Sequence, residues 1–279
     1  MSILVSGAAG VLGARIADAL AADEHRVTRA ARRADRPPGM LQLDLTDEAA
    51  VRAAAAGHQT AILCPILTVS APAAHWLAEE GIERLVLFSS NNVAVDPQSS
   101  VYTALRQAEE SLSAICVPIT ILRPTMIYGY PGDGNLSRML QLAHRYGALP
   151  CPGSGEARQQ PVHVDDVARA ACAAALSTDL VGTYAVAGPD IITAKALFAA
   201  ILHAAGKNPD RVIPIPLAPL KGIARAAEAL RLPFPLTTAQ LARFETDKTA
   251  AGPPLPDTPA KTTLADGLAA LSKALINEQ

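Results

Sequence analysis

The stretch Ile3-Leu4-Val5-Ser6-Gly7-Ala8-Ala9-Gly10-Val11-Leu12-Gly13 predicts a glycine-rich turn between a buried strand and a helix. The apolar run before the turn is typical of a buried strand, and apolar residues recur at helical spacing through residues 14–20. Gly7 permits the tight turn, Gly10 lets backbone N–H groups approach a diphosphate, and Gly13 lets the helix pack closely on the strand. The N–H groups and the dipole of such a helix start favour an anion. The turn therefore predicts a site for the phosphates of a dinucleotide, although a purely structural tight turn has a similar pattern.

The composition is that of an ordinary globular protein. The chain has 279 residues, half of them apolar and 18% charged, with a net charge of −2, which is enough for a sizeable core. Basic residues are scattered apart from Arg29, Arg32, Arg33 and Arg36, and only 4% of the residues are aromatic. A surface for a polyanion or a platform for stacking bases is therefore not indicated, and we expect no nucleic acid partner.

The cellular location is predicted from the start of the chain and from its cysteines. Met1-Ser2 leads directly into the first strand, and no apolar run reaches membrane-spanning length. The four cysteines lack metal-ligand spacing, and Cys64, Cys116 and Cys172 lie in apolar stretches typical of buried free thiols. We therefore expect a cytoplasmic protein with neither a membrane partner nor a metal ion.

Strand-like and helix-like segments alternate over the first 122 residues. The pattern predicts strands at 3–6, 26–30, 41–43, 60–66, 84–89 and 118–122, and helices at 11–22, 47–56, 70–80 and 102–115. This alternation predicts an α/β fold, a Rossmann-like doubly wound parallel sheet with helices on both faces. Ligands of such a sheet bind beyond the carboxyl ends of the strands.

The character of the chain changes after this alternating region, where prolines and glycines become frequent and later segments are mainly helical. We predict a dinucleotide-binding Rossmann domain at 1–188, of which 128–160 contributes to the cap. Residues 189–279 are expected to form a small, mainly helical C-terminal substrate cap. The proline-rich stretch 252–259 is interpreted as a surface loop.

The end of the predicted second strand indicates which coenzyme is bound. It reads Ala30-Ala31-Arg32-Arg33. No carboxylate stands there to repel a 2′-phosphate, whereas a guanidinium can hold a phosphate in a bidentate manner. We therefore expect NADP, with NAD less favoured; the alternative is a solvated basic loop.

Three further segments carry a resemblance to a known family. They are Leu87-Phe88-Ser89-Ser90, Ile121-Leu122-Arg123-Pro124-Thr125-Met126-Ile127-Tyr128-Gly129 and Pro161-Val162-His163-Val164-Asp165-Asp166-Val167-Ala168. With the G-x-x-G-x-x-G spacing, they resemble the extended and atypical short-chain dehydrogenase/reductases, an NAD(P)-dependent epimerase/dehydratase-like family. The resemblance reaches to about residue 188. It implies that the second segment closes the nicotinamide side of the cleft and that the aspartates of the third cap a helix.

The turn and the resemblance together indicate the residues that contact the coenzyme. Asp44 matches an adenine-contacting aspartate of the family, although with Thr46 it could instead cap the helix at 47–56. The expected coenzyme contacts are Gly7, Ala9, Gly10, Val11, Leu12, Gly13, Arg32, Arg33, Asp44, Leu45, Cys64, Pro65, Ser89, Tyr102, Arg106, Pro124 and Thr125.

Catalysis in the family uses a Tyr-x-x-x-Lys pair on one helix and a serine or threonine from the preceding strand end. The matching helix carries Tyr102 and Arg106, so arginine replaces lysine. Arg106 can still favour the phenolate of Tyr102 from the same helix face, but it cannot give up a proton in a relay. The hydroxyl position falls on Asn91, or on Ser90 with a shift of one residue.

The candidate substrate contacts lie further along the chain. Many relatives hold a nucleotide-sugar diphosphate with an arginine at the position where this chain has Gln159. Arg158 is adjacent, and Arg138 lies in the cap segment. We take these three residues as the candidate substrate contacts.

Two functions are compatible with these patterns. The first is an NAD(P)-dependent oxidoreductase or epimerase/dehydratase-like enzyme acting on a small hydroxyl- or carbonyl-bearing substrate, with a nucleotide sugar as one option. The second is a catalytically weak or inactive NADP(H)-binding protein with a structural or redox-sensing role. Residues 132–138 resemble atypical members akin to the nucleotide-binding accessory subunit of respiratory complex I. Relatives pair through helices matching 70–80 and 102–115, which suggests a homodimer.

Overall fold

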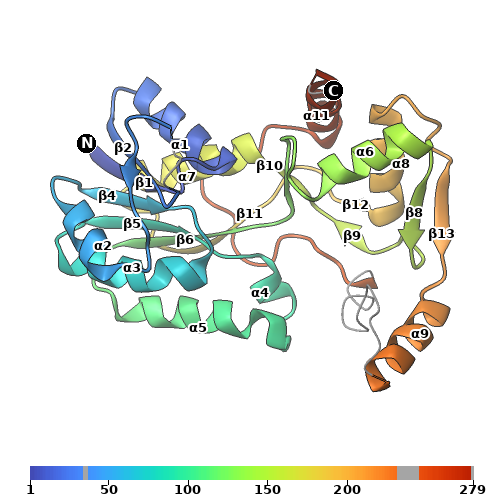
Figure 1. The fold of residues 1–279 in the computed structure, drawn as a ribbon, viewed down its shortest axis with the longest axis horizontal. Coiled ribbons are helices and arrows are strands. Elements are labelled where there is room, and N and C mark those ends of the chain that lie inside the picture. The colour runs from blue at the N-terminus through green and yellow to red at the C-terminus, as the bar shows by residue number, and fades with distance from the viewer. Residues whose placement is uncertain (34–36, 231–244, 278–279) are drawn as a thin grey trace. The chain divides into compact units, whose positions relative to one another are not determined.

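The computed structural model, which describes residues 1–33, 37–230 and 245–277, contains a seven-stranded parallel sheet (Figure 1). In spatial order the strands are β11 (Gly182–Val186), β6 (Ile119–Pro124), β5 (Arg84–Phe88), β4 (Thr60–Leu63), β1 (Ser2–Ser6), β2 (Arg26–Ala31) and β3 (Leu41–Gln42). Every neighbouring pair of these strands is parallel. The sheet confirms the predicted Rossmann-like fold. Arg36 and residues 231–244 of the expected cap lie outside the described residues.

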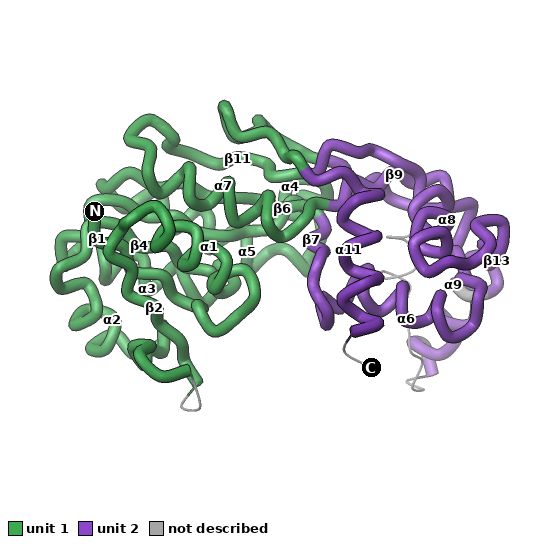
Figure 2. Tube along the Cα trace, turned by 90° about the horizontal axis from the view of Figure 1, so that it is seen from above, with its two compact units in different colours: residues 1–125, 162–187, 250–261 green, residues 126–161, 188–249, 262–279 purple. Residues whose placement is uncertain are grey.

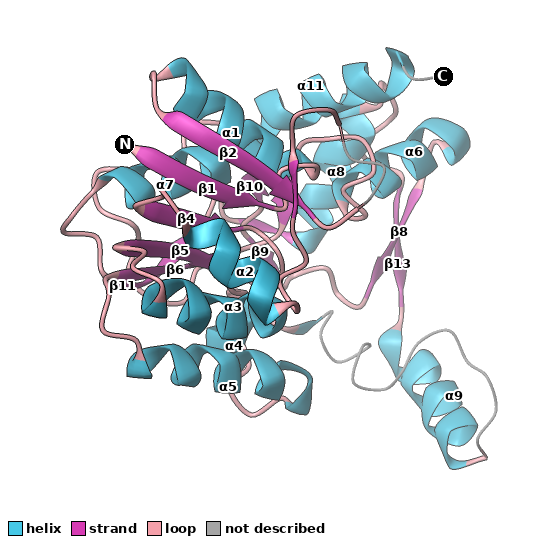
Figure 3. Ribbon diagram, turned by 60° about the vertical axis from the view of Figure 1, so that its left-hand side comes forward, coloured by secondary structure: helices cyan, strands magenta, loops and turns pink. Residues whose placement is uncertain are grey.

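Helices cover both faces of the sheet, as a doubly wound fold requires (Figure 3). On one face α1 (Val11–Ala22) contacts α7 (Val164–Leu176). On the other face α3 (Leu67–Glu79) contacts both α2 (Glu48–Ala55) and α5 (Thr103–Ser111). The strand order reverses between β1 and β4, so the carboxyl ends of these two strands are the place where such a sheet binds its ligand.

The strands form where apolar residues are continuous in the sequence. Ile3, Leu4 and Val5 of β1 are fully buried, as expected for a parallel strand covered on both faces. The strand predicted at 60–66 ends earlier, at Leu63, because Pro65 has no N–H group to donate to a ladder.

Two helical segments differ from the prediction. The helix expected at 102–115 is divided into the 3-10 turn η1 (Ser100–Tyr102), α5 and the 3-10 turn η2 (Leu112–Ala114). The short helix α4 (Asn92–Val95) was not predicted. The cap of α2 is Asp47, whose carboxylate accepts from the N–H of Ala50 at 3.1 Å. The alternative in which Asp44 and Thr46 cap this helix is therefore wrong.

The chain divides into two compact units (Figure 2). Unit 1 comprises residues 1–125, 162–187 and 250–261 and contains the parallel sheet; unit 2 comprises 126–161, 188–249 and 262–279. The predicted domain boundary at residue 188 coincides with the point after β11 where the chain leaves unit 1 and enters the segment 188–249 of unit 2. The assignment of a cap to substrate binding stays a prediction.

Unit 2 is built mainly of helices. They are α6 (Leu136–Tyr146), α8 (Ala194–Ala204), α9 (Leu217–Ala229) and α11 (Leu264–Asn277). Two short sheets join β8 (Leu149–Pro152) to β13 (Val212–Ile215) and β9 (Arg158–Gln159) to β12 (Ile192–Thr193). The short strands β7 (Ile127–Tyr128) in unit 2 and β10 (Val162–His163) in unit 1 complete the described elements. The Tyr128 side chain is fully buried in the core of unit 2, packed so closely on α11 that a Cβ on Gly267 would lie 2.3 Å from its hydroxyl oxygen.

Residues 250–261, which we call the strap, return to unit 1 late in the sequence. The N–H of Ala185 on β11 donates to the carbonyl of Pro253 at 2.8 Å, and Leu255 is buried. The proline-rich stretch is thus a loop, as predicted, but one bonded to the outer strand of the sheet. In the described part of the chain, no helix has the length and apolar character needed to cross a membrane.

Candidate functional site

The glycine turn between β1 and α1 has the geometry that the sequence predicts. Gly7 has φ +74°, and a Cβ on it would lie 3.1 Å from Cβ of Cys64. A Cβ on Gly13 would lie 2.4 Å from the carbonyl oxygen of Gly7, which is a direct clash. Gly10 is the N-cap of α1 and supplies no side-chain cap, and the first turn of the helix carries no acidic residue. The N–H groups at the start of α1 are therefore suited to an external anion.

A cavity of about 430 Å³ lies beside this turn, within the size range of ligand pockets. It is lined by residues from the turn and from the ends of β2, β3 and β4: Ser6, Gly7, Ala9, Gly10, Ala31, Arg32, Arg33, Leu43, Asp44, Leu45, Pro65, Ile66 and Val69. The structure thus brings together eight of the expected coenzyme contacts, which are Gly7, Ala9, Gly10, Arg32, Arg33, Asp44, Leu45 and Pro65.

Five residues of this lining were missed by sequence reasoning: Ser6, Ala31, Leu43, Ile66 and Val69. Three of them lie at or directly after the ends of β1, β2 and β3, so their position at a strand end could have indicated them: Ser6, Ala31 and Leu43. Ile66 is 59% exposed although it is apolar. Its position after the β4 end was a usable signal, whereas nothing in the helical pattern distinguished Val69.

Opposite charges meet in the cavity. The Oδ1 atom of Asp44 accepts from the N–H of Thr46 at 3.0 Å and from its hydroxyl at 2.8 Å. These two hydrogen bonds, followed by the charge of Arg32, hold the pKa of Asp44 below its usual value. Asp44 is therefore ionised near neutral pH, and the cavity presents one carboxylate and two guanidinium groups.

Several buried polar atoms at the carboxyl edge of the sheet lack a hydrogen-bond partner among the described residues. They include the hydroxyl oxygens of Ser6, Ser89 and Thr125, which stand at or directly after the ends of β1, β5 and β6. The Nη1 atom of Arg106 is also buried without a hydrogen-bond partner among the described residues. Leaving such groups unpaired is costly, so they fit a polar ligand lying along this edge. The polar groups of a nicotinamide nucleotide suit them, and three of the four residues were predicted coenzyme contacts.

The predicted catalytic pair lies at the start of α5. Tyr102 ends η1 and its ring packs against the hydrophobic core. Arg106 donates through Nη2 to the carbonyl of Ser99 at 3.1 Å and to the hydroxyl of Thr103 at 3.0 Å. Arg106 therefore stabilises the bend between η1 and α5 with one arm of its guanidinium, while the other arm has no partner in the described residues.

Ser90 and Asn91 also bond within unit 1. Asn91 is 2% exposed, and its Oδ1 atom accepts from the N–H of Ala251 at 2.9 Å. The Ser90 hydroxyl accepts from the N–H of Asn92 at 3.3 Å. Their roles in catalysis stay predictions.

The His-Val-Asp-Asp segment is architectural, but the capping residue differs from the expected one. His163, rather than the aspartates, caps α7, because its Nδ1 atom accepts from the N–H of Asp165 at 3.3 Å. Burial lowers the pKa of His163 and keeps the ring neutral and able to accept. Asp165 instead pairs with Arg15 of α1 at 2.5 Å, which ties α7 to the helix that follows the glycine turn.

The three candidate substrate residues lie in unit 2. Arg158 donates to both carboxylate oxygens of Asp247, through its N–H at 2.7 Å and its Nε at 2.8 Å. This pairing lowers the pKa of Asp247. Gln159 is buried in the two-stranded ladder with β12.

The third of these residues, Arg138, is exposed in the first turn of α6. The Oδ1 atom of Asp133 accepts there from the N–H groups of Asn135 at 2.8 Å and Ser137 at 3.0 Å. The helix start beside Arg138 is thus already neutralised by a carboxylate, which disfavours an anion.

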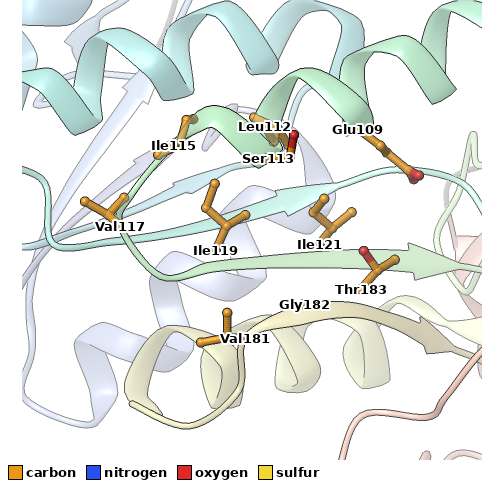
Figure 4. A pocket seen from close by; sticks show the side chains of 10 residues that line it. All are labelled: Glu109, Leu112, Ser113, Ile115, Val117, Ile119, Ile121, Val181, Gly182 and Thr183. Atoms are coloured by element: carbon orange, nitrogen blue, oxygen red, sulfur yellow. The ribbon is translucent and has the colours of Figure 1, made fainter.

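A second cavity, of about 330 Å³, lies between η2 and the strands β6 and β11 (Figure 4). Its lining is mainly aliphatic, with Leu112, Ile119 and Ile121 facing into it. Its titratable side chain, Glu109, forms an ion pair with Arg123. This cavity contains none of the expected site residues.

The cysteines are free thiols in different environments. Cys116 is exposed, so its predicted burial is wrong: it follows η2 in a surface connection. Burial raises the pKa of Cys64 to about 12 and that of Cys172 to about 11. Among the described residues, no group of three or more His, Cys, Asp or Glu side chains could hold a metal ion.

The family is established by comparison with known proteins. A family model described as NAD(P)H-binding matches residues 7–178, more than half of the chain. This chain belongs to the NAD(P)H-binding family. The matched range contains the glycine turn, every lining residue of the cavity beside it except Ser6, and the strand ends that carry Ser89 and Thr125.

Solved structures share the fold of this chain over nearly its whole length. The UDP-glucose 4-epimerase of Thermus thermophilus, solved with NAD, has a TM-score of 0.71 at 19% identity, with 99% of each chain covered. The dTDP-glucose 4,6-dehydratase of Bacillus anthracis, also with NAD, has a TM-score of 0.74 at 14% identity, covering 100% of this chain and 97% of that one. At these identities the likeness concerns the fold.

A curated relative is closer in sequence but longer. Subunit 9 of the NADH dehydrogenase [ubiquinone] 1 alpha subcomplex, a mitochondrial protein of Arabidopsis thaliana, is 33% identical over 165 residues. The match covers 58% of this chain and 40% of that protein. The chain thus spans well under two thirds of this relative.

Proposed function

We propose that this protein binds NADP(H) at the carboxyl edge of its sheet and exchanges hydride between the coenzyme and a small hydroxyl- or carbonyl-bearing substrate. The observation that carries the proposal is the cavity in which the glycine turn, Arg32, Arg33 and Asp44 converge. Family membership supports NAD(P)H binding in general; the choice of NADP(H) and the chemistry are the proposal.

The adenosine half of the coenzyme accounts for the proposed preference for NADP(H) over NAD(H). The start of α1 would hold the diphosphate through its N–H groups. Arg32 and Arg33 would hold the 2′-phosphate, with charge-assisted hydrogen bonds worth roughly 1.5–3 kcal/mol each. Asp44 would accept from a donor on the adenosine, since its second carboxylate oxygen is not used by Thr46.

The nicotinamide half would satisfy the buried polar atoms of Ser89, Thr125 and Arg106. When bound, the coenzyme supplies or accepts the hydride. The Tyr102 hydroxyl would act as acid or base toward the substrate oxygen, with the charged Arg106 four residues further along the chain.

A specific observation favours a second candidate, a protein that holds the coenzyme without turnover. Oδ1 of Asn91 and Nη2 of Arg106 are both bonded to main-chain groups of the protein itself. Two groups expected to serve catalysis therefore have structural partners. The similarity to a subunit of a mitochondrial NADH dehydrogenase supports this candidate as well. A protein of this kind would have a structural or redox-sensing role.

The substrate is proposed to lack a diphosphate. The solved neighbours include enzymes of nucleotide sugars. In this chain, however, Arg158 is paired with Asp247, and Asp133 occupies the helix start beside Arg138. A cytoplasmic location and a homodimer formed through α3 and α5 complete the proposal.

Turnover separates the two candidates. NADPH-loaded protein would be mixed in turn with ketones, quinones and sugars. The loss of the nicotinamide absorbance of NADPH is then followed over time. The enzyme proposal predicts oxidation that Tyr102→Phe abolishes. The matched variant Tyr184→Phe should leave it intact, because the Tyr184 hydroxyl of β11 donates to the carbonyl of Val181, the residue just before this strand. Equal rates in Tyr102→Phe would remove Tyr102 from the mechanism, and retained NADPH without oxidation would favour the second candidate.

A further inference from the structure

The strap, residues 250–261, is bonded to two residues from the sequence analysis. They are Asn91, a predicted catalytic residue, and Asp166, which was expected to cap a helix. We propose that Asn91 is a positioning residue that anchors the strap to the ends of β5 and β6. The inference concerns unit 1 alone and does not depend on coenzyme binding.

The first anchor is the Asn91 side chain. Its Oδ1 atom accepts from the N–H of Ala251 at 2.9 Å, and the N–H of Asn91 donates to the carbonyl of Pro124 at 3.1 Å. One buried residue therefore links the end of β5, the end of β6 and the beginning of the strap. A buried amide that is bonded to main chain in this way is costly to displace, because the strap N–H would lose its partner.

The second contact is the edge of the sheet. The N–H of Ala185 donates to the carbonyl of Pro253 at 2.8 Å, and Ala185 forms a parallel bridge with Pro254. Leu255 follows with 6% of its surface exposed. The strap thus covers part of the outer edge of β11, where unpaired main-chain groups would otherwise remain.

The third anchor is on α7, at the other end of the strap. Asp166 is 2% exposed and accepts from the N–H of Lys261 at 3.1 Å. Arg169 pairs with Asp166 and donates to the carbonyl of Pro259 at 3.0 Å. The buried carboxylate is thereby satisfied by an arginine and a strap N–H, as a charge removed from water requires.

The composition of the strap makes these side-chain anchors decisive. Four of its twelve residues are prolines, at positions 253, 254, 256 and 259, which have no N–H group to donate. Few main-chain bonds can therefore hold the segment, and side chains at both ends determine where it lies. The chain enters unit 1 at one end of the strap and leaves it at the other. Asn91 holds the strap near the first of these points and Asp166 holds it near the second.

This assignment changes the view of the predicted catalytic set. The Oδ1 atom that the strap uses can only accept, and Ser90 offers a hydroxyl donor at the neighbouring position. The Ser90 hydroxyl accepts from the N–H of Asn92 and retains its own proton for donation.

Native-state hydrogen exchange of the coenzyme-free protein tests the proposal, with the Ala185 amide as reporter. Asn91→Leu keeps the size of the side chain but removes the acceptor, and Ala251→Pro removes the donor while leaving Asn91 in place. Both variants are expected to exchange the Ala185 amide about tenfold faster, the scale of one lost hydrogen bond. Asn91→Asp keeps an acceptor oxygen and should restore wild-type protection, and Asn92→Ala is the neighbouring control.

Unchanged Ala185 protection in Asn91→Leu or in Ala251→Pro would overturn the proposal, as would an Asn91→Asp variant that exchanges as fast as Asn91→Leu. If Asn91→Leu does not fold, Ala251→Pro carries the test. Because no coenzyme is present, a failure of the proposed function leaves these outcomes unaffected.

Discussion

Gly10 and Gly13 stand three residues apart in one turn but meet different constraints. A Cβ on Gly13 would lie 2.4 Å from the Gly7 carbonyl oxygen, between main-chain atoms that cannot move aside. A Cβ on Gly10 would lie 3.3 Å from the same oxygen, and the φ of Gly10 is −86°. One glycine is thus required by the fold, and the other mainly by what approaches the turn from outside.

We predict that Gly13→Ala destabilises the protein by about 1–3 kcal/mol, the usual cost of overpacking. Gly10→Ala is the matched control and should melt close to the wild type while binding the coenzyme more weakly, because its methyl group stands where the diphosphate would lie. Denaturant unfolding and coenzyme titration of both variants measure these effects. Equal stability of the two variants would contradict the close approach of α1 to the turn.

The cysteines provide a second test at the residue scale. Burial raises the pKa of Cys64 to about 12 and of Cys172 to about 11, and it raises the pKa of Cys151 as well. These thiols stay protonated at pH 8 and should react slowly with iodoacetamide, since the thiolate is the nucleophile. Mass spectrometry should find Cys116 alkylated first.

The same shifts have a consequence for stability. Because the folded state holds these protons above the ordinary thiol pKa of 9.0, the stabilisation is complete below pH 9 and is lost as the pH rises toward 12. Rapid alkylation of Cys64 in the folded protein at pH 8 would contradict its burial.

At the scale of elements, Arg84 holds the loop between α7 and β11. It begins β5, is 7% exposed and donates through Nη2 to the carbonyl of Thr178 at 2.8 Å, with Nη1 3.5 Å from the carbonyls of Ala174 and Leu180. Burial lowers the pKa of Arg84. A buried guanidinium thus closes the carboxyl end of α7 and sets the start of the outer strand.

Replacing Arg84 by methionine should therefore cost about 1.5–3 kcal/mol, the range for hydrogen bonds to a charged group. The matched control is Arg26→Met, because Arg26 also begins a strand of this sheet but is exposed. Thermal unfolding of the two variants gives the comparison. Equal melting temperatures would show that the carbonyls do not depend on Arg84.

Elements were predictable where the local pattern decides them. The strands of the sheet follow from apolar runs such as Ile3-Leu4-Val5, whose burial on both faces needs no long-range information. The division of the helix at 102–115 was not predictable, because Arg106 stabilises the bend through Ser99, a contact made across the turn. The cap of α7 was missed for a similar reason: His163 is an uncommon capping residue, and its role depends on burial that keeps it neutral.

At the scale of the whole molecule, the cavity beside the glycine turn was largely predictable and the partners of the predicted catalytic residues were not. Gly7, Arg32 and Asp44 converge because parallel strands end at one edge, which the alternation of elements already implies. The bond between Asn91 and Ala251 joins residues 160 positions apart, and no local pattern encodes such a pairing. Sequence reasoning therefore predicted which residues converge at this cavity, but it did not predict the hydrogen-bond partners of the residues beside it.

The measurement that tests the central claim most directly is calorimetric titration of the ligand-free protein with NADPH and with NADH. We expect tighter binding of NADPH, and we expect Arg32→Ala to weaken it about tenfold to a hundredfold, as the loss of one charge-assisted hydrogen bond implies, while NADH binding changes little. Arg26→Ala, at the opposite end of β2, should bind as the wild type does. Equal affinities for the two coenzymes, unchanged in Arg32→Ala, would contradict the assigned preference, and no heat with either coenzyme would contradict the site itself.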